Sequence, residues 1–575
     1  MVSKGLAACW MLALCAPLAD ASGLTFARDI APIIYQQCAP CHRPGESGPF
    51  SLLGYEDVKK RASQIAAVTR SRYMPPWLPE AGYGSFAGER RLTDAQIRLI
   101  GDWVSQGAAE GEGTPSPPRF TEGWQLGTPD LVLNAGSAFS LPAGGPDLFW
   151  NFVYTPGVKT PRYVRAIEIR PGNPRIVHHA NLLIDRTGST RGQQTAPGKG
   201  FAGMDLTIVR SPFDPDGHFL FWKPGSTPYV EPNGFAWRLN PGDELVMNTH
   251  LHPSGKPEQA RPSIGLYFTD KPQTRFPLLV QLEHDGALRI PAGDRDFVVS
   301  DDFQLPLDAD VLAVYPHAHY LGKLLEAYAT LPGGEKKWLV RITDWDPNWQ
   351  AVYYYREPVF LPKGSVISMR YHYDNSAANV RNPNHPPKLV ASGNQSTDEM
   401  GHLWLQVLPR GANDHRLELQ EALMRHRLEK YPDDFEAHFN LGAVMLARLN
   451  VSGAVSMLEA AVKAEPARAE AHNMLGAGLV RQGRVAEGIE QFRLALGERP
   501  DFANARFNLA NALVRSGKLE EAIADYRQVV AVFPGDPVAK DRLEKALEAR
   551  AGELTSQGKR EAAAALYREA ESLKK

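Results

Sequence analysis

The carboxyl-terminal part of the chain carries a 34-residue repeat, which restricts its fold more than any other feature of the sequence. From about residue 415 the composition turns to Ala, Leu, Glu and Arg, and apolar residues recur at helical spacing. Three columns recur every 34 residues: Leu441, Leu475 and Leu509; Ala454, Gly488 and Ala522; and Pro432, Pro466, Pro500 and Pro534. A fixed period of this length predicts stacked helical pairs that bury their apolar faces against one another.

The repeat resembles the tetratricopeptide repeat, with small residues where paired helices approach and Pro at the end of each unit. Gly483 and Gly517 mark the turn inside two repeats, whereas Leu449 stands in that column of the first. We expect three full repeats and then an irregular pair, in which the late Gly558 predicts a longer helix and a cap. The resemblance implies an α-solenoid over residues 415–575 whose concave surface binds an unidentified protein partner.

The amino-terminal residues have the pattern of an export signal. Lys4 precedes the apolar run Leu6–Leu18, and Ala19-Asp20-Ala21 fits the small-residue pattern of a cleavage site. The run is too short to span a bilayer comfortably. Residues 1–21 are therefore predicted to be a signal peptide. We expect a periplasmic or secreted protein with no integral membrane segment after cleavage, and lipid anchoring at Cys15 stays open.

Cys38, Cys41 and His42 form a C-x-x-C-H motif, the attachment signal for c-type haem. Each thiol can form a thioether with a haem vinyl group, and the histidine is placed to bind the iron. A thioredoxin-like redox pair and half of a zinc site are the alternatives. Both fit poorly, because no βαβ pattern surrounds the motif and the mature chain has no second cysteine pair. Between the motif and the Pro-rich stretch near residue 115, Met74 is the only other soft or imidazole donor, so it is the expected second axial ligand. Core packing is its alternative role.

The stretch around this motif resembles small c-type cytochromes over residues 24–110, which implies a small all-α domain with one covalently bound haem c. A capped helix is predicted from Thr93, with an apolar face that includes Trp103. Residues 111–124 are rich in Gly, Pro, Ser and Thr without periodicity, so they are predicted to be a linker.

Residues 125–412 consist of short alternating runs interrupted by Gly and Pro, which predicts many short antiparallel strands. About 285 residues is enough for two β-sandwiches in series, which we place at residues 125–272 and 273–412. Lys and Arg number 63 and Asp and Glu number 65, so no basic field favours a nucleic-acid partner.

Histidines in this region occur in pairs: His178-His179, His250-x-His252 and His317-x-His319. Residues two apart on a strand share a face, so His317 and His319 can bind one metal ion, as can the second pair. Adjacent residues normally face opposite ways, so His178 and His179 could bind one ion only at a bulge or a strand end. An isolated histidine is usually structural, and three are interpreted so: His218, His284 and His372.

Four motifs stand in a fixed order: Arg175-Ile-Val-His-His-Ala180, Val246-Met-Asn-Thr-His-Leu-His-Pro253, Tyr315-Pro-His-Ala-His-Tyr-Leu-Gly-Lys323 and Asp398-Glu-Met-Gly401. In this order they resemble the copper type II, ascorbate-dependent monooxygenases, a family that includes peptidylglycine hydroxylating enzymes and dopamine β-monooxygenase. The resemblance covers about half of the chain. It implies two jelly-roll-like β-sandwich domains that bind two copper ions.

Carried over motif by motif, the resemblance implies that His178, His179 and His250 hold an electron-transferring copper. It implies that His317, His319 and Met400 hold the catalytic copper that binds dioxygen. His250 is chosen over His252 by its position in the family motif, and local chemistry does not separate the two. Imidazole with a thioether suits copper that cycles between Cu(I) and Cu(II), whereas zinc would gain little from the sulfur of Met400.

Together these features predict an exported copper-dependent monooxygenase that hydroxylates a C–H bond of a small organic or peptide-like substrate with O2. A reductant or redox protein would supply the electrons, and the fused haem would relay them. Tyr315 replaces a family arginine that grips a substrate carboxylate, and His402 replaces a family asparagine, so peptides ending in glycine are not expected substrates. A non-catalytic periplasmic copper and haem redox or copper-handling module that recruits a partner through its repeats is the alternative. A scaffold that has lost its chemistry is a further one.

Two aromatic and polar runs, residues 344–350 and 371–376, lie close in sequence to the expected catalytic site. They could line a substrate cleft, or they could be strand edges and turns.

Overall fold

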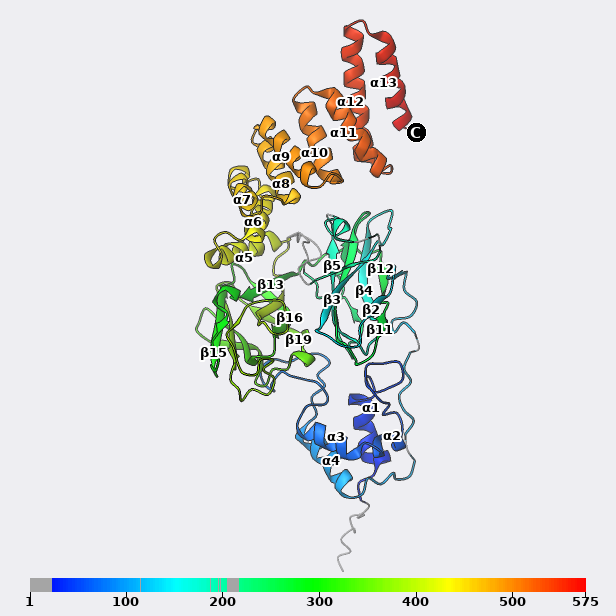
Figure 1. Cartoon of the computed structure of the whole chain (residues 1–575), viewed down its shortest axis with the longest axis vertical. Helices are drawn as coiled ribbons and strands as arrows, with labels where there is room; N and C mark the ends of the chain where they lie inside the picture. Colours follow the sequence, from blue (N-terminus) through cyan, green and yellow to red (C-terminus); the bar gives the residue numbers. More distant parts are fainter. Residues whose placement is uncertain are drawn as a thin grey trace, which may run out of the picture. The chain divides into compact units, whose positions relative to one another are not determined.

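A computed structural model describes residues 23–574, apart from residues 114, 122, 187, 195, 197 and 204–216. The expected signal peptide at residues 1–21 lies outside the described residues. Within the described ranges, none of the helices combines the length and the apolar character that crossing a membrane requires. The chain divides into two compact units, one of residues 1–77 and 88–121 and the other of residues 78–87 and 122–575 (Figure 1).

The first unit is helical. It contains the π-helix η1 (Phe26–Ile30) and the helices α1 (Ala31–Gln37), α2 (Tyr55–Lys59), α3 (Ala62–Arg70) and α4 (Asp94–Ser105). The rings of Phe26 and Trp103 are fully buried with their centroids 6.2 Å apart, so the first and last helical segments share one core. Helix α4 begins as the sequence predicts, because the side chains of Thr93 and Gln96 each accept a hydrogen bond from the other residue's amide.

Two boundaries differ from the sequence-based expectation. Residues 78–87, which we assigned to the first domain, pair with a strand of the second unit through the amide of Ala87, which donates to the Tyr354 carbonyl at 2.8 Å. Phe86 supports this pairing because its buried ring stacks on Tyr355. Part of the expected linker belongs to the first unit, where Pro115 accepts a hydrogen bond from the hydroxyl of Tyr35.

The first strand-rich region runs from residue 131 to residue 269, and its sheets are antiparallel throughout. Its strands are β1 (Leu131–Asn134), β2 (Phe139–Leu141), β3 (Leu148–Tyr154), β4 (Arg162–Arg170), β5 (Val177–Asp185), β6 (Phe201–Ala202), β7 (Phe221–Trp222), β8 (Tyr229–Val230), β9 (Trp237–Leu239), β10 (Glu244–Leu251), β11 (Glu258–Ala260) and β12 (Ser263–Thr269). One five-stranded sheet has the order β1-β12-β4-β8 with β9 paired to β4, and the other has the order β6-β3-β10-β5-β7. One apolar core takes side chains from both sheets, as in a β-sandwich.

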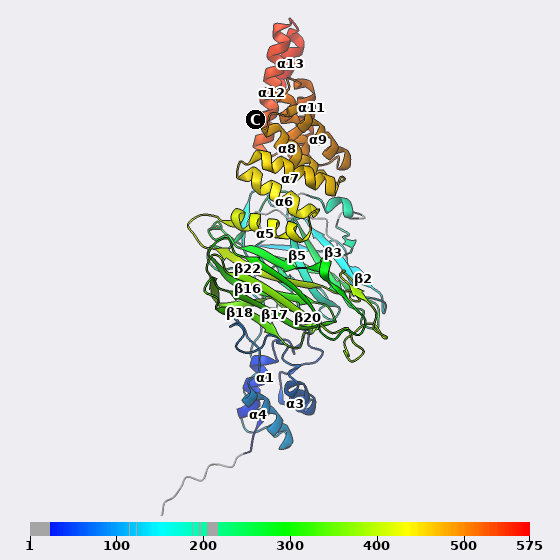
Figure 2. The same ribbon diagram turned by 90° about the vertical axis from the view of Figure 1, so that its left-hand side faces the viewer.

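The second strand-rich region runs from residue 278 to residue 409 (Figure 2). Its strands are β13 (Leu278–Glu283), β14 (Arg289–Ile290), β15 (Phe297–Gln304), β16 (Ala309–Ala318), β17 (Gly322–Thr330), β18 (Lys336–Ile342), β19 (Tyr353–Leu361), β20 (Val366–Tyr373), β21 (Val390–Ala391) and β22 (Gly401–Pro409). Two four-stranded antiparallel sheets have the orders β13-β22-β16-β19 and β15-β20-β17-β18. They face each other, because the buried Tyr371 and Tyr373 on β20 donate hydrogen bonds to carbonyls at the start of β22.

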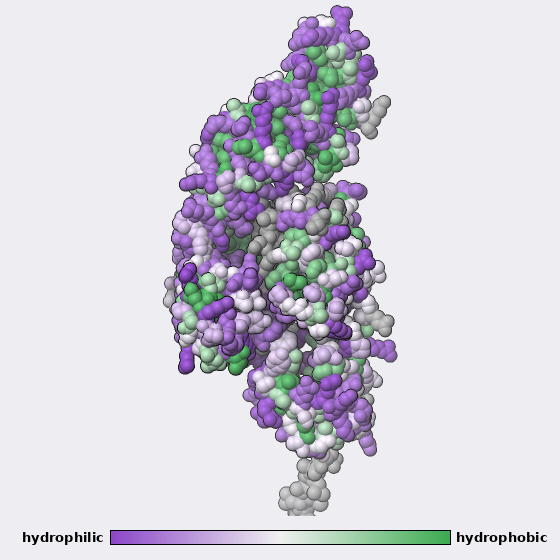
Figure 3. Space-filling view, in the orientation of Figure 1, coloured by the Kyte–Doolittle hydropathy of each residue, from purple (hydrophilic) through white to green (hydrophobic). Residues whose placement is uncertain are grey.

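The carboxyl-terminal region is a stack of helices. These are α5 (Arg416–Lys430), α6 (Phe435–Ala447), α7 (Val451–Ala464), α8 (Ala469–Arg481), α9 (Val485–Glu498), α10 (Ala503–Arg515), α11 (Leu519–Val532), α12 (Pro537–Ser556) and α13 (Arg560–Leu573). On the face in Figure 3 the surface of this region is mostly hydrophilic, with apolar residues among the hydrophilic ones. Helix α12 has 20 residues and ends just before Gly558, as the late glycine predicted.

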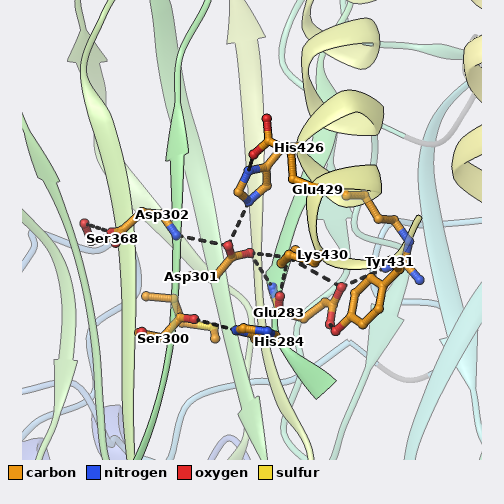
Figure 4. Close-up of polar contacts among 12 residues, drawn as sticks. Glu283, His284, Ser300, Asp301, Asp302, Ser368, His426, Glu429, Lys430 and Tyr431 are labelled. Carbon is orange, nitrogen blue, oxygen red and sulfur yellow. Dashed lines mark hydrogen bonds and ion pairs between the residues drawn. The ribbon is translucent and has the colours of Figure 1, made fainter. Parts of the chain in front are cut away.

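Helix α5 is joined to the second strand-rich region through buried charges (Figure 4). Asp301 on β15 accepts hydrogen bonds from His426 at 2.8 Å and from Lys430 at 2.6 Å. Glu283 on β13 accepts from Arg427 at 2.9 Å and from the hydroxyl of Tyr431 at 2.8 Å. Because each acid has partners on α5, charge-assisted hydrogen bonds attach this first helix of the carboxyl-terminal region to the sheets.

Candidate metal centres

A β-bulge brings His178 and His179 to the same side of their sheet. Strand β5 pairs with β10 so that His179 faces His250, but the next pair joins Val177 to Leu251. His178 is therefore the extra residue of the bulge, and adjacent side chains need not alternate there. The sequence analysis predicted that His178 and His179 could bind one ion only at such a bulge or at a strand end.

The rings of His178, His179 and His250 converge. One ring nitrogen of each lies within 4.8 Å of the corresponding nitrogens of the other two, which is close enough to hold one metal ion. His178 Nε2 and both ring nitrogens of His250 are buried without a hydrogen-bond partner. Buried polar atoms are nearly always satisfied in native proteins, so these unpaired nitrogens fit a metal ion as the missing partner. We name these three residues the first cluster.

Burial keeps the first cluster uncharged at neutral pH. Burial first, and then the charge of His252, lowers the pKa of His178 to about 4. Burial and the neighbouring imidazoles lower the pKa of His179 and of His250 well below 6.5. Since metal ions bind the neutral form of imidazole, these residues need lose no proton to bind one at pH 7.

The second expected ligand set lies where β16 and β22 meet. His317 on β16 is directly opposite His402 on β22, and Ala318 is opposite Gly401. Alternation along a strand puts Met400 on the side of the sheet that carries His402, and His319 on the side that carries His317. The rings of His317 and His319 are 5.3 Å apart between centroids, and the Met400 side chain is buried. We name His317, His319 and Met400 the second cluster.

Glu399 ties the two strands of the second cluster together. The oxygens of this fully buried carboxyl group accept hydrogen bonds from the amides of His319, Leu321 at 2.9 Å and Met400 at 2.8 Å. One side chain therefore fixes the backbone of His319 against that of Met400. Burial raises the pKa of Glu399 to about 8, while the backbone amides act in the opposite direction. The sequence motif contained Glu399, but its function could not be read from the motif alone.

Both histidines of the second cluster engage Nδ1 with the protein. His317 Nδ1 lies 2.8 Å from Gln350 Oε1, and His319 Nδ1 lies 3.1 Å from the Asp398 carbonyl. Each Nδ1–H can donate to its oxygen acceptor, which leaves Nε2 as the metal-binding nitrogen of each ring. Burial lowers the pKa of His317 and of His319, so both are neutral at pH 7. Two neutral imidazoles and a thioether form a soft donor set that suits copper better than zinc.

Gln350 connects the two clusters. Its Oε1 accepts from His317 Nδ1 and, at 2.7 Å, from the hydroxyl of Tyr315, while its Nε2 lies 3.3 Å from His179 Nδ1. Gln350 is the last residue of the aromatic and polar run 344–350. Its contacts place this end of the run between the two clusters. The run 371–376 behaves differently, because Tyr371 and Tyr373 are fully buried core residues.

Four other histidines of the strand-rich regions have partners of their own. His218 lies 2.8 Å from Glu231, His372 lies 2.7 Å from Asp296, and His284 Nδ1 lies 3.3 Å from the Ser300 carbonyl. His402, which faces His317, has its Nε2 2.9 Å from Asp285. These contacts agree with the structural role that the sequence analysis gave to the first three.

In the first unit, the expected haem-attachment residues lie in the loop after α1. Cys38 and Cys41 are both free and half-buried, and His42 Nδ1 lies 3.2 Å from the Phe50 carbonyl. This contact orients the ring and leaves Nε2 for an iron ion, as metal-binding histidines require. Gly48 folds onto the motif so closely that a Cβ there would lie 2.6 Å from the Cys41 carbonyl oxygen. Met74 is half-buried after α3, and its amide donates to Val68.

Comparison with known proteins identifies the repeats. Two overlapping segments, residues 444–501 and 474–537, match the tetratricopeptide repeat family. Among solved structures the chain is similar to the crystal structure of MamA, at 19% identity over 28% of this chain and 89% of that one, with a TM-score of 0.24. It is also similar to YrrB, described as a TPR protein with an unusual peptide-binding site, at 22% identity over 28% of this chain and 78% of that one, with a TM-score of 0.24. No curated protein matches the chain.

The family match confirms the expectation of helical repeats in the carboxyl-terminal region, and repeats of this family suggest binding of a protein partner. The matched residues all lie between 444 and 537, so they concern the repeats and not the two clusters.

Proposed function

We propose that this protein is an exported copper-dependent monooxygenase that inserts one atom of O2 into a C–H bond of an organic substrate. The proposal is supported by the convergence of the His178, His179 and His250 ring nitrogens and by the contacts of Gln350 with both His179 and His317. The order of the four motifs in the sequence supports the same activity.

Copper bound at the two clusters would supply one-electron chemistry, alternating between Cu(I) and Cu(II). The overall reaction balances when O2, the C–H bond, two electrons and two protons give the alcohol and one water molecule. Around the second cluster, Gln350 and Asp398 orient the histidine rings, and Glu399 holds Met400 against His319. These contacts would hold the two rings and the backbone of Met400 in place before an ion binds.

Tyr315 bears on the class of substrate. Its side chain is buried, it is uncharged at neutral pH because burial raises its pKa, and its hydroxyl donates to Gln350. The residue therefore offers no cation for a substrate carboxylate, in agreement with the departure from the family motif. We propose a small organic or peptide-like substrate that is not recognised through a carboxylate at this position.

We propose that a haem c on Cys38, Cys41, His42 and Met74 passes electrons one at a time to the first cluster. Support comes from the two free thiols and from the carbonyl contact that orients the His42 ring. Ligation by histidine and methionine raises the reduction potential of a haem relative to two histidines, which suits electron transfer.

Stopped-flow mixing tests the relay. The haem is reduced first, and the protein is then mixed anaerobically with Cu(II) while the haem spectrum is followed. We expect oxidation of the haem in the wild type and a haem that stays reduced in a His178→Ala, His179→Ala double variant. A wild-type haem that stays reduced on the timescale of turnover would exclude the relay.

Oxygen consumption tests the hydroxylation itself. With 18O2 and a panel of small organic substrates, we expect a product that carries one labelled oxygen atom and forms in step with O2 consumption. The second candidate function is a non-catalytic copper and haem module that recruits a partner through its repeats, and the family match of the repeats favours it. That candidate predicts copper binding and haem oxidation without labelled product.

A further inference from the structure

Three donor atoms beside the first cluster have the spacing of a metal shell. Asp147 Oδ2 lies 3.3 Å from His250 Nε2 and 3.4 Å from His252 Nε2. Ligand atoms held at about 2.0–2.1 Å by one tetrahedral ion lie about 3.3–3.4 Å from each other. The three residues also form a group whose donor atoms all lie within 4.8 Å of one another.

The nitrogens in this group lack any other partner. His250 Nε2 and His252 Nε2 are both buried, and neither forms a hydrogen bond. A carboxylate oxygen at metal-shell separations from two otherwise unpaired imidazole nitrogens is a donor set without its central atom. The spacing and the missing partners are independent observations that indicate the same ion.

The strands hold these side chains in place. Strand β3 pairs with β10 so that Leu148 faces Leu251, and Asp147 therefore enters β3 beside His252. The ring of His250 stacks on Phe149 at 4.3 Å between centroids, with the planes 12° apart. An ion can enter from solvent, because the side chains of Asp147 and His252 are 21% and 32% exposed.

We propose that Asp147 Oδ2, His250 Nε2 and His252 Nε2 form a binding site for a divalent first-row ion, with Zn2+ and Cu2+ as the matching class. One carboxylate and two imidazoles suit these borderline ions and lack the sulfur that favours Cu(I). With Nε2 engaged, His250 could bind a second ion beside His178 and His179 only through Nδ1, as a bridging imidazolate that has released its ring N–H proton to solvent. The site does not depend on the proposed hydroxylation.

Zinc titration of the metal-free full-length protein tests the site by calorimetry. We expect Asp147→Asn to weaken the Zn2+ affinity of this site by more than about 100-fold, beyond the 10–100-fold that a merely supporting residue costs. His252→Gln should have the same effect. His179→Gln is the matched control, because it alters the first cluster and leaves all three donors, so it should retain this binding event.

Zinc-edge X-ray absorption separates a ligand from a supporting residue. In Asp147→Cys loaded with Zn2+, a ligand at position 147 would add a sulfur atom at about 2.3 Å from the zinc. Asp147→Ser is the control and should add none. Wild-type Zn2+ affinity in both Asp147→Asn and His252→Gln, or no zinc-bound sulfur in Asp147→Cys, would overturn the proposal. Neither readout involves substrate, so failure of the hydroxylation would not affect the result.

Discussion

The side-chain oxygen of Gln350 lies 2.8 Å from Nδ1 of His317, and the amide nitrogen of the same glutamine lies 3.3 Å from His179. One buried side chain therefore contacts a ring of each cluster. Since Oε1 also accepts from the Tyr315 hydroxyl, the orientation of the amide follows from its two donors. The two clusters are neighbours joined through protein.

Gln350→Leu should alter the second cluster without preventing copper binding at the first. His317 would lose the acceptor that fixes its ring, and the loss of such a partner costs about 10–100-fold in metal affinity or activity. Gln350→Glu keeps an acceptor for His317 and should cost less. Copper titration followed by electron paramagnetic resonance measures both effects.

The control for this prediction is Gln406→Leu. Gln406 is another buried glutamine, and its side-chain amide donates to the Gly217 carbonyl at 2.7 Å instead of contacting a histidine of either cluster. Equal effects of Gln350→Leu and Gln406→Leu would show that general packing, and not the contact with His317, is responsible.

Met400→Ile should abolish hydroxylation while leaving haem attachment and binding at the first cluster intact. Isoleucine keeps most of the buried volume but removes the sulfur that favours Cu(I). We expect the Cu(I) affinity of the second cluster to fall by at least about 100-fold, more than the loss of a supporting residue costs. Oxygen uptake and copper analysis check this, and unaltered turnover would remove Met400 from the site.

The attachment of α5 should depend on pH through Asp301. Burial alone would raise the pKa of Asp301, but hydrogen bonds from His426 and Lys430 lower it below 3.8 overall. A carboxyl group with a lowered pKa in the folded state stabilises the fold above its unfolded pKa, and this contribution is lost as the pH falls through the folded value. The protection of α5 amides from hydrogen exchange, relative to their intrinsic exchange rates at each pH, should therefore fall below about pH 4.

Asp301→Asn should remove that pH dependence. It should also destabilise the attachment by about 1.5–3 kcal/mol at pH 7, because Lys430 would lose the closer of its two carboxylate partners and keep only Glu283, whose Oε1 lies 3.6 Å away. Exchange in α10, which is remote in sequence from Asp301, serves as the internal reference. A wild-type profile in the variant would contradict the assigned role of this cluster.

Leu449→Gly should stabilise the repeats by about 1 kcal/mol. Leu449 has a φ of 61° and an 80% exposed side chain, whereas the matching positions of the next two repeats are Gly483 and Gly517 with φ of 86° and 72°. A left-handed conformation costs a residue with a Cβ about 1–2 kcal/mol, and little packing is lost at this surface. Thermal unfolding of the repeats measures the change, and Leu449→Ala, which keeps the Cβ, should not reproduce it.

The repeats were the most predictable part of the fold, because local periodicity and turn residues define them. Even the longer α12 followed from the late Gly558. The sequence indicated only that His178 and His179 would need a bulge or a strand end to bind one ion. It did not predict the bulge itself, since no local signal places an extra residue there. The family resemblance named the expected ligands, but it gave no account of how the strands position these residues.

Asp147 and Gln350 show why other parts of the site could not be predicted. Asp147 is near His252 only because β3 pairs with β10 in one register, and sequence alone does not determine that register. Gln350 belongs to the second strand-rich region and contacts His179 of the first, a contact between residues 171 positions apart. Residues 78–87 belong to the second unit and not to the expected first domain, because Phe86 is buried against a strand some 270 residues away. This long-range contact has no local sequence signal either.

Copper-edge X-ray absorption of the Cu(I)-loaded protein tests the central claim most directly, because it reports whether sulfur binds the metal. The account predicts a copper–sulfur contribution in the wild type that disappears in Met400→Ile, while the nitrogen contribution of the histidines remains. A wild-type spectrum with nitrogen and oxygen ligands alone, or a sulfur signal that Met400→Ile leaves unchanged, would contradict it.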